Sequence, residues 1–443
     1  MSLSGLSASA DTASDGVVAR QAAYAILNDI FFQRKNMDEA FARAPGFNDL
    51  SGRDRGFVRL LVSIVLKRHR EIDKTLQGLL HEPLDQLKPP QLINIFRLGV
   101  AQFAFLETKA HAVVNTSVLL AEAEGIHHHK PLVNAVMRRL TREGFQRLDE
   151  RDAGRLNTPD WLWQQWMQDY GVETALSITA AHLTEAPVDI TVKADAEGWS
   201  RKLAAELLPT GSLRKASAGF VPDLPGFAEG EWWVQGAAAA IPARLMGDVR
   251  GKTVVDLCAA PGGKTAQLAA VGAKVSAVDR SAERMKRLDE NMKRLGVPVE
   301  SIVADGAVWQ PRELVDAVLL DAPCSATGTI RHQPDVLILK ELKDQEKLAA
   351  LQRRLMQNAL TMLKPGGMLV YCTCSLQKDE SERQTSWLLE HAQNVQLDPI
   401  RADELHLAPD MITDRGEVRT LPFHWQERGG MDGFYVARFR HIP

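Results

Sequence analysis

The chain has 443 residues, of which 45% are hydrophobic and 25% are charged, and its formal net charge at pH 7 is -3. This length and apolar content predict two to four domains, each with its own core. A charge so near zero excludes a bulk basic field, so any nucleic-acid partner must be held by local basic patches. A membrane span is not expected, because the densest apolar run, residues 60–66, is far shorter than the roughly 18 residues needed.

Cysteine usage and the first residues predict the compartment. Only 4 cysteines occur in the whole chain, which is typical of a reduced, intracellular protein and not of a disulfide scaffold. Residues 1–16 are small and polar and lack the basic and apolar regions of a signal peptide, so we expect a disordered leader. The sequence therefore predicts a cytoplasmic protein.

Residues 17–145 are expected to form an all-α bundle, because apolar residues recur at three-and-four spacing between proline and glycine breaks. Arginine and lysine residues gather in this region, and both solvated helix faces and a phosphate-contacting surface explain them. They are Arg53, Arg55, Arg59, Lys67, Arg68, Arg70, Lys74, Arg138, Arg139 and Arg142. The adjacent histidines 127–129 diverge on a turn, so a metal site is not expected there.

Residues 146–235 change in character and predict a small α+β linking module. A tryptophan-rich helix is followed by the strand-like stretch APVDITVK, a further helix and short strands that end at WWVQ. Trp161, Trp163 and Trp166 are interpreted as core and interface residues in preference to platforms for base stacking.

Residues 236–443 alternate strand and helix patterns. The strand patterns are near-continuous apolar runs, which is typical of strands buried on both faces. They cover residues 253–258, 274–279, 299–305, 315–321 and 366–374. The helix expected at 281–295 carries an apolar stripe that would pack on the sheet. The pattern predicts a doubly wound, Rossmann-like α/β domain.

Four of these strands end in residues suited to a nucleoside ligand. The first ends in CAAPGGKT (258–265), and the next three end in Asp279, Asp305 and Asp321. Ligands of such sheets bind at the carboxyl ends of the strands, where glycines allow close approach and a carboxylate suits a ribose diol. A phosphate loop would need glycine where Cys258 stands, and a GxGxxG fingerprint is missing. S-adenosylmethionine, which has adenosine but no phosphate, fits best.

Two thiols follow strands at the same sheet edge, Cys324 in DAPCS and Cys374 in YCTCS. Cys372 and Cys258 are interpreted as small buried hydrophobic residues. A four-cysteine zinc site is the competing interpretation, but the spacing and the lack of histidine support disfavour it, and no metal is expected.

A thiol beside a methyl donor suggests a specific reaction. Carbon 5 of cytosine is too weak a nucleophile to take a methyl group directly, whereas a thiolate that adds to carbon 6 creates an enamine that can. With an ordinary pKa of about 8.5, a thiol is mostly protonated at pH 7, so the site must favour the thiolate. The sequence does not indicate which neighbour does so.

The motifs taken together resemble the RNA (cytosine-5) methyltransferases. The resemblance rests on CAAPGGKT, AVD, AD, LLDAPCSATGTIR, KPGGMLVYCTCS and DGFYVARF, in this order. HAVVNTSVLLAE (111–122) and LVNAVMRRL (132–140) are similar to the NusB-like RNA-binding domain of the Fmu/Sun (RsmB) group. That group methylates small-subunit (16S) ribosomal RNA, so the resemblance implies this partner.

The resemblance also implies roles for individual residues. Cys374 would be the nucleophile, and Cys324 would assist proton removal or elimination during product release. Asp321 would serve the cofactor or accept a hydrogen bond from cytosine N4. The cofactor pocket would be lined by Cys258, Ala259, Ala260, Pro261, Gly262, Gly263, Lys264, Asp279 and Asp305.

The chain departs from the family pattern at two places. Residues 378–381 read Lys-Asp-Glu-Ser where the family often has Pro-Glu-Glu-Asn, and Cys372 stands where a small residue is usual. Neither change affects the two thiols, but substrate positioning or thiol chemistry could differ. The target cytidine must be flipped or unpaired, because a stacked base cannot react.

Three alternatives stay open. The substrate could be transfer RNA, or the protein could be a non-catalytic RNA-binding or antitermination-type factor. An amino-group methyltransferase would be expected to end its fourth strand in an Asn/Asp-Pro-Pro-aromatic pattern, whereas this strand ends in DAPC. A monomer is expected.

Overall fold

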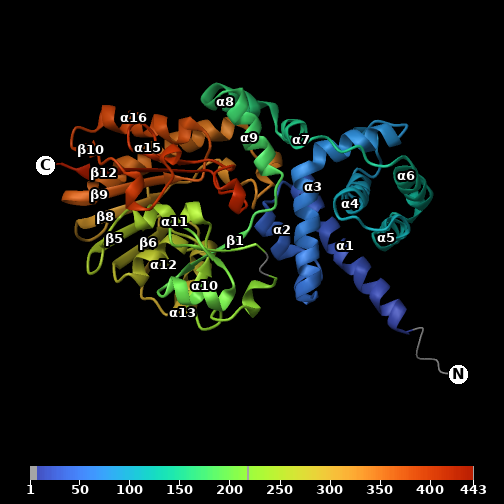
Figure 1. Ribbon diagram of the computed structural model, residues 1–443, viewed down its shortest axis with the longest axis horizontal. Coiled ribbons are helices and arrows are strands. Elements are labelled where there is room, and N and C mark those ends of the chain that lie inside the picture. Colours follow the sequence, from blue (N-terminus) through green and yellow to red (C-terminus); the bar gives the residue numbers. More distant parts are fainter. Residues whose placement is uncertain (1–6, 217–218, 443) are drawn as a thin grey trace. The chain divides into compact units, whose positions relative to one another are not determined.

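The computed structural model of the protein describes residues 7–216 and 219–442 (Figure 1). The chain divides into two compact units. The first holds the residues up to Trp163 together with His332–Leu339, and the second holds Gln164–Arg331 and Lys340–Pro443. The chain therefore passes from the second unit to the first and back within the segment that follows the predicted DAPC motif.

The first unit is a bundle of helices around one apolar core. The core includes Ile26, Leu61, Leu66 and Phe96, which are fully buried. Ser51 caps the long third helix by accepting a hydrogen bond from the Asp54 N–H. The main helices are α1 Ser7–Gln33, α2 Met37–Arg43, α3 Gly52–Leu79, α4 Leu92–Phe105, α5 Ala110–Ala123, α6 Lys130–Glu143, α7 Glu150–Asn157 and α14 Val336–Leu339, and α8 Asp160–Tyr170 begins in this unit.

The first helix is longer than predicted. Helix α1 begins at Ser7, so residues 7–16 are helical where a disordered leader was expected, and residues 1–6 lie outside the described part of the chain. The segment contains no proline, and each residue added to an existing helix gains a backbone hydrogen bond without a new nucleus. The structure thus gives residues 7–16 as helix, and the leader expected at residues 1–16 stays a prediction.

The second unit begins with helices α9 Val172–His182 and α10 Ala196–Leu203 and a small antiparallel sheet. Its strand order is β2-β3-β1-β4, with β1 Val188–Val192, β2 Glu206–Leu207, β3 Leu213–Lys215 and β4 Trp232–Val234. A buried ion pair joins Arg214 to Asp189 through two hydrogen bonds of 2.7 and 2.8 Å. Trp166 is fully buried, as expected for a core residue, while Trp161 and Trp163 are half-buried.

The large sheet confirms the predicted α/β architecture. Its order is β10-β12-β9-β8-β5-β6-β7, and β11 pairs with β12. Strands β7, β6, β5, β8 and β9 are mutually parallel, whereas β12 and β10 run antiparallel. The strands are β5 Thr253–Leu257, β6 Lys274–Asp279, β7 Glu300–Val303, β8 Val315–Asp321, β9 Leu363–Thr373, β10 Val395–Leu397, β11 Val418–Thr420 and β12 Phe434–His441.

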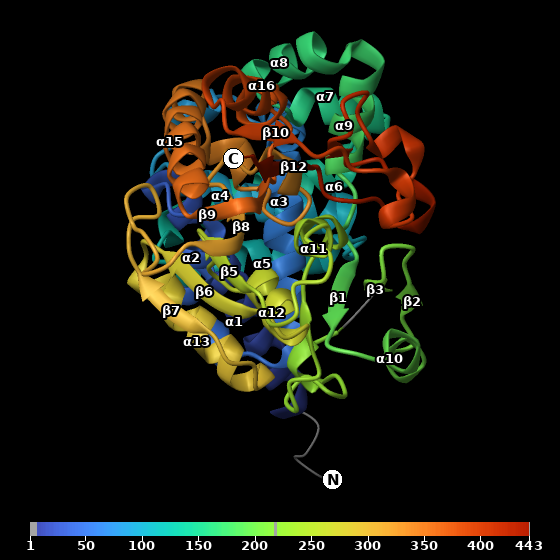
Figure 2. The same ribbon diagram turned by 90° about the vertical axis from the view of Figure 1, so that its left-hand side faces the viewer.

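Helices cover both faces of this sheet (Figure 2). Side chains alternate along each strand, so Val254 packs in the core with α11 Ala237–Arg244 and α12 Gly263–Ala270, while Val255 packs on the opposite face. That opposite face is covered by α15 Leu342–Thr361 and α16 Glu382–His391. Helix α13 Ala282–Leu295 uses Met285, Leu288, Met292 and Leu295 to pack beside α12, as its predicted stripe requires.

Strand order reverses at β5, because β6 lies on one side of it and β8 on the other. In doubly wound sheets the crevice for ligands opens at the carboxyl ends of the strands that flank such a reversal. The segments after β5 and β8 therefore lie where a ligand would bind. Within residues 7–216 and 219–442, no helix has both the length and the apolar character needed to cross a membrane.

Candidate active site

The structure brings the two predicted thiols together. Cys324 follows β8 and Cys374 follows β9 directly, and these strands are parallel neighbours in which Asp321 pairs with Cys372. The two sulfur atoms lie 3.4 Å apart. A backbone hydrogen bond of 2.9 Å from Gly328 N–H to the Cys374 carbonyl also joins the two loops. Both thiols are part-exposed, so a substrate can approach them.

Cys324 is the thiol that stays protonated. Its hydrogen bond to the Cys374 sulfur, together with burial, raises the pKa of Cys324 well above the ordinary value. Two thiolates at this separation would repel each other, so the pair carries one negative charge at most. In the singly ionised pair, Cys324 donates its S–H to the Cys374 sulfur.

An ion pair spans the reversal point of the sheet. Lys264 Nζ, from the first turn of α12, lies 2.7 Å from an oxygen of Asp321, the last residue of β8. Burial alone would lower the pKa of Lys264, but Asp321 more than offsets this and the pKa is raised. Lys264 therefore stays charged, and it also lies over the Phe434 ring at 5.0 Å. Sequence reasoning placed both residues in the site but did not foresee their pairing.

The other two cysteines are not placed to react. Cys372 is fully buried in the core on one face of the sheet, and burial raises its pKa. Cys258 is half-buried and has a left-handed φ of 61° at the start of the glycine-rich loop. Burial also raises the pKa of Cys258. A raised pKa disfavours the thiolate, which is the reactive form.

Residues 258–264 form the loop after β5 and the first turn of α12, and they lie against the tip of β6. Gly262 has a φ of +102°, and a Cβ there would lie 3.0 Å from Leu288 and Met292, so glycine is required. Asp279 accepts hydrogen bonds from Ala260 N–H at 3.3 Å and Ser281 N–H at 2.9 Å. The loop and this carboxylate are therefore in direct contact, and their role as the wall of a cofactor pocket stays a prediction.

Two further groups complete this edge. Arg284, on the first turn of α13, forms an ion pair of 3.1 Å with Asp279 and also contacts the Ala260 carbonyl. It was missed in the sequence, although its position five residues after Asp279 was the available signal. Asp305 follows β7 and is exposed, with one oxygen accepting from Ala307 N–H. Asp279 beside a close backbone turn, with Asp305 one strand further, is a pair of acceptors that fits the ribose hydroxyls of an adenosine moiety.

Asp256 is a buried acid beneath this loop. It is fully buried on β5, accepts a hydrogen bond of 2.6 Å from Thr265, and its second oxygen has no partner. Burial raises the pKa of Asp256 to about 7. No carboxylate that remained fully charged at neutral pH would be stable in such a place without further donors.

We expect Asp256→Asn to stabilise the protein relative to the wild type at pH 8 but not at pH 4. The raised pKa means that the folded state holds a proton that the unfolded state loses above pH 3.8. Stability from this group is therefore present at low pH and lost as pH rises toward 7, at about 1.4 kcal/mol per unit. Denaturant unfolding of both proteins between pH 4 and 8 checks this; parallel curves would contradict it.

The predicted basic residues of the first unit serve different purposes. Lys67 is buried, Arg68 pairs with Glu71, and Arg59 lies over the rings of Phe41 and Phe47. These residues support the bundle. The exposed ones are Arg53, Arg59, Lys74, Arg138 and Arg142.

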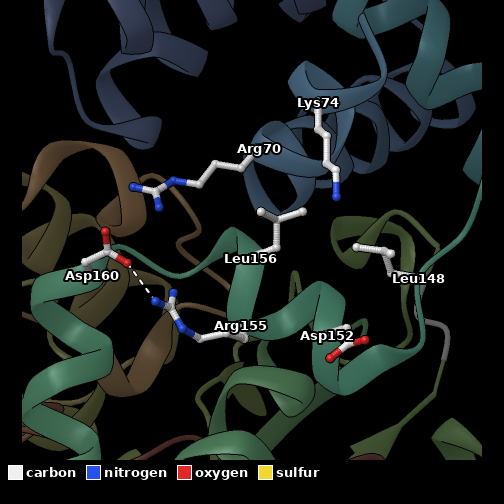
Figure 3. A pocket seen from close by; sticks show the side chains of 7 residues that line it. All are labelled: Arg70, Lys74, Leu148, Asp152, Arg155, Leu156 and Asp160. Atoms are coloured by element: carbon white, nitrogen blue, oxygen red, sulfur yellow. Dashed lines mark hydrogen bonds and ion pairs between the residues drawn. The ribbon is translucent and has the colours of Figure 1, made fainter. Parts of the chain in front are cut away.

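Arg70 and Lys74 line a surface pocket of about 570 Å³ within the first unit (Figure 3). They project from α3, and Arg155 projects from α7. Asp160 neutralises Arg155 across 2.8 Å. The pocket thus combines charged side chains with the apolar Leu148 and Leu156, and two cations from one helix lie on its rim. No group of three metal-ligating side chains occurs in the part of the chain that the structure describes.

Comparisons with known proteins agree with this geometry. The family model "16S rRNA methyltransferase RsmB/F" matches residues 244–440, and the NusB family model matches residues 17–142. Ribosomal RNA small subunit methyltransferase B of Xanthomonas campestris pv. campestris is 34% identical over 419 residues, covering 90% of this chain and 94% of that one. The protein of the same name from Xylella fastidiosa strain Temecula1 is 35% identical over 441 residues, covering 96% and 98%.

A solved structure shares the fold across both units. The crystal structure of PH0851 superposes with a TM-score of 0.77 at 24% identity, covering 96% of this chain and 98% of that one. The reversed sheet, its glycine-rich loop and its acidic strand ends define an S-adenosylmethionine-dependent methyltransferase domain that follows a NusB-like helical domain. The chain belongs to the 16S rRNA methyltransferase RsmB/F family.

Proposed function

We propose that the protein methylates carbon 5 of a cytidine in small-subunit ribosomal RNA through a covalent adduct with Cys374. The observation that carries this proposal is the 3.4 Å separation of Cys324 and Cys374 at the ligand-binding edge of a methyltransferase sheet. Methyl transfer to a nitrogen needs no thiol, whereas methylation of cytosine carbon 5 needs a nucleophile at carbon 6. The alternative of an amino-group substrate leaves the thiol pair without a purpose.

The chemistry follows from the roles of the two sulfurs. The Cys374 thiolate forms a bond to carbon 6, and the electron pair displaced from the ring double bond makes carbon 5 nucleophilic. Bound S-adenosylmethionine supplies the methyl group, which carbon 5 takes as the carbon–sulfonium bond breaks. The carbon 5 proton then leaves to a solvent base, the carbon 6–sulfur bond breaks, and its electron pair returns to Cys374. The S–H of Cys324 stabilises the departing thiolate by donating to it.

The neighbouring residues would hold the two substrates. Residues 258–263 and Asp279 would bind the cofactor, with Asp305 one strand further along the same edge. Lys264 follows β5 and Asp321 ends β8, while the thiols follow β8 and β9. In the strand order of the sheet, the ion pair therefore lies between this wall and the thiols. Asp321 can accept from cytosine N4, and the Lys264 ammonium, 2.7 Å from one of its oxygens, would hold that carboxylate in position. The cofactor remains the alternative ligand of Asp321.

Ribosomal RNA is the preferred substrate because the relatives that match nearly the whole chain carry that substrate in their names. The NusB-like domain would contribute RNA contacts, and the reacting cytidine would be flipped or unpaired. A transfer RNA substrate and a non-catalytic RNA-binding role are the alternatives that the test must separate.

The test is transfer of labelled methyl from S-adenosylmethionine to unmodified 16S ribosomal RNA, to an assembled small subunit and to transfer RNA. The product is digested to nucleosides, so that 5-methylcytidine is distinguished from N4-methylcytidine. We expect label in 5-methylcytidine from ribosomal RNA only. Label in transfer RNA alone would make transfer RNA the substrate in place of ribosomal RNA. Label on N4 would overturn the thiol mechanism. No label in any RNA would favour a non-catalytic RNA-binding factor.

We expect charge reversal at the rim of the α3 pocket, Arg70→Glu with Lys74→Glu, to weaken RNA binding. Log affinity falls with log salt, and the slope becomes shallower by about 0.9 for each phosphate that the protein no longer neutralises. The slope of the double variant should therefore be shallower by about two. Affinity for ribosomal RNA is measured between 50 and 300 mM salt by filter binding. Lys109→Glu, at an exposed lysine of the same bundle, is the matched control. An unchanged slope would mean that the pocket binds no RNA phosphate.

A further inference from the structure

Glu380 is a fully buried carboxylate that neither the sequence motifs nor the proposed chemistry uses. It belongs to the short helical turn η6 Lys378–Glu380, between the Cys374 loop and α16. Buried acids that are not ionic partners of a cation are uncommon, and they persist where several donors satisfy them. The donors of Glu380 are therefore informative.

Those donors come from the residues next to the two thiols. Ser325, which follows Cys324, donates its backbone N–H at 2.9 Å and its hydroxyl at 2.5 Å. Ser375, which follows Cys374, donates its hydroxyl at 2.6 Å. Gln352 on α15 donates to the same carboxyl at 3.4 Å and to the Pro323 carbonyl at 2.9 Å. One carboxyl group thus joins both thiol-bearing loops to the helix behind them.

The same connection is reinforced around Glu380. The two serine hydroxyls lie 3.0 Å apart, and Thr327 donates to Gln377 at 2.7 Å. Arg419 donates to the Ser375 carbonyl at 2.7 Å and forms an ion pair with Glu382. Tyr371 donates to the Glu380 carbonyl at 2.7 Å, so the backbone of the turn is fixed as well. The carboxyl group of Glu380 is consequently held in place, and it can fix the distance between the loops of Ser325 and Ser375.

The strands alone do not fix the sulfur positions. Cys324 lies three residues beyond the end of β8, in a loop whose next residue but one, Ala326, has a left-handed φ of 59°. Small errors of position in a reacting group are costly, since a displacement of about 1 Å can reduce a rate by roughly 100-fold. A group that fixes both loops against each other therefore has a direct influence on the thiol pair.

We propose that Glu380 is a positioning residue that sets the separation and orientation of Cys324 and Cys374 by binding Ser325 and Ser375 together. Its two oxygens accept from both loops, and within residues 7–216 and 219–442 it is the charged group that bonds both serine side chains. The consequence for turnover rests on the proposed function, whereas the consequence for thiol geometry does not. The test therefore measures both.

The first readout is the rate at which diamide links Cys324 to Cys374 in the full-length protein without RNA. Each thiol loses a proton and an electron, a sulfur–sulfur bond forms, and diamide is reduced to the hydrazine. Peptide mass mapping quantifies the 324–374 link separately from Cys258 and Cys372. Glu380→Gln keeps the volume but puts an amide where the Ser325 N–H and two hydroxyls need acceptors. We expect it to slow the link by roughly tenfold.

The second readout is steady-state methyl transfer with the same variant. We expect kcat to fall by roughly 10- to 100-fold while KM for S-adenosylmethionine stays within about twofold, because Glu380 does not contact the 258–264 loop. Glu390→Gln, at an exposed glutamate on α16, is the matched control. Thermal unfolding shows whether each variant is folded. Ser325→Ala loses the hydroxyl bond to Glu380 but keeps the backbone N–H bond, so it should show a smaller effect in the same direction. This variant replaces Glu380→Gln in the test if Glu380→Gln does not fold.

The outcomes separate the two proposals. Wild-type rates of linking and turnover in folded Glu380→Gln, or in Ser325→Ala where that variant replaces it, would overturn the positioning role. A raised KM with unchanged kcat would also overturn it, in favour of a contact to substrate. If the wild type transfers no methyl group but Glu380→Gln still slows the link, the proposed function fails and the positioning role stands.

Discussion

Cys374→Ala is expected to abolish methyl transfer, with kcat reduced by roughly 10⁴-fold or more, because Cys374 supplies the sulfur that bonds to carbon 6 in the proposed mechanism. The neighbouring Cys324 cannot take over easily, since burial still raises its pKa when the Cys374 sulfur is absent. Binding of S-adenosylmethionine, measured by calorimetry, should be unchanged. Single-turnover transfer to 16S ribosomal RNA is the measurement.

The matched control for this variant is Cys372→Ala. Cys372 lies two residues earlier, on β9, and is fully buried, where it packs among apolar side chains and donates its S–H to Asp321 at 3.5 Å. Its truncation should cost about 1 kcal/mol or more of stability and leave methyl transfer within severalfold of wild type. Equal activity in Cys374→Ala and Cys372→Ala would refute the assignment of the nucleophile.

Cys324→Ala is expected to accumulate a protein–RNA adduct that survives denaturation. The bond from Cys374 to carbon 6 can still form, but the departing thiolate loses the S–H that lies 3.4 Å away. Without that donor, elimination should become the slow step, and turnover should fall by roughly 10²- to 10⁴-fold. A denaturing gel with labelled RNA should show a shifted band that contains both protein and label.

The double variant Cys324→Ala with Cys374→Ala is the control for the adduct. It should show no shifted band, because the sulfur that forms the bond is absent. If Cys324→Ala releases product at the wild-type rate, Cys324 has no role in elimination. An adduct that also forms in Cys374→Ala would mean that a different residue is the nucleophile.

Much of this site could be predicted because strand ends are visible in a sequence. Apolar runs indicated β5 to β9, and the residue after each run fixed which side chains would reach the ligand-binding edge. The thiols, the 258–264 loop and Asp279 follow from that rule alone. The antiparallel pairing of β10 and β12 could not be predicted in this way, because apolar periodicity encodes neither the direction of a strand nor the order in which strands pair.

The missing parts are contacts between residues distant in the chain. The ion pair of Lys264 with Asp321 spans 57 positions, and Glu380 reaches Ser325 across 55. A lone acid in a polar segment gives no sign of burial, and only the folded chain shows that Glu380 is enclosed while Asp305 is exposed. Likewise, nothing in the spacing of the basic residues told buried Lys67 from exposed Lys74.

The pairing of β9 has a consequence for how catalysis is shared between protein and RNA. This strand bonds to β8 on one side and to β12 on the other, where the ladder runs from Met368 to Thr373. Opening such a strand requires breaking two ladders at once, and segments of this kind open last in a folded protein. The backbone that leads into Cys374 is thus anchored on both sides. If Cys374 is the nucleophile, as proposed, we expect approach to bonding distance to come mainly from movement of the RNA.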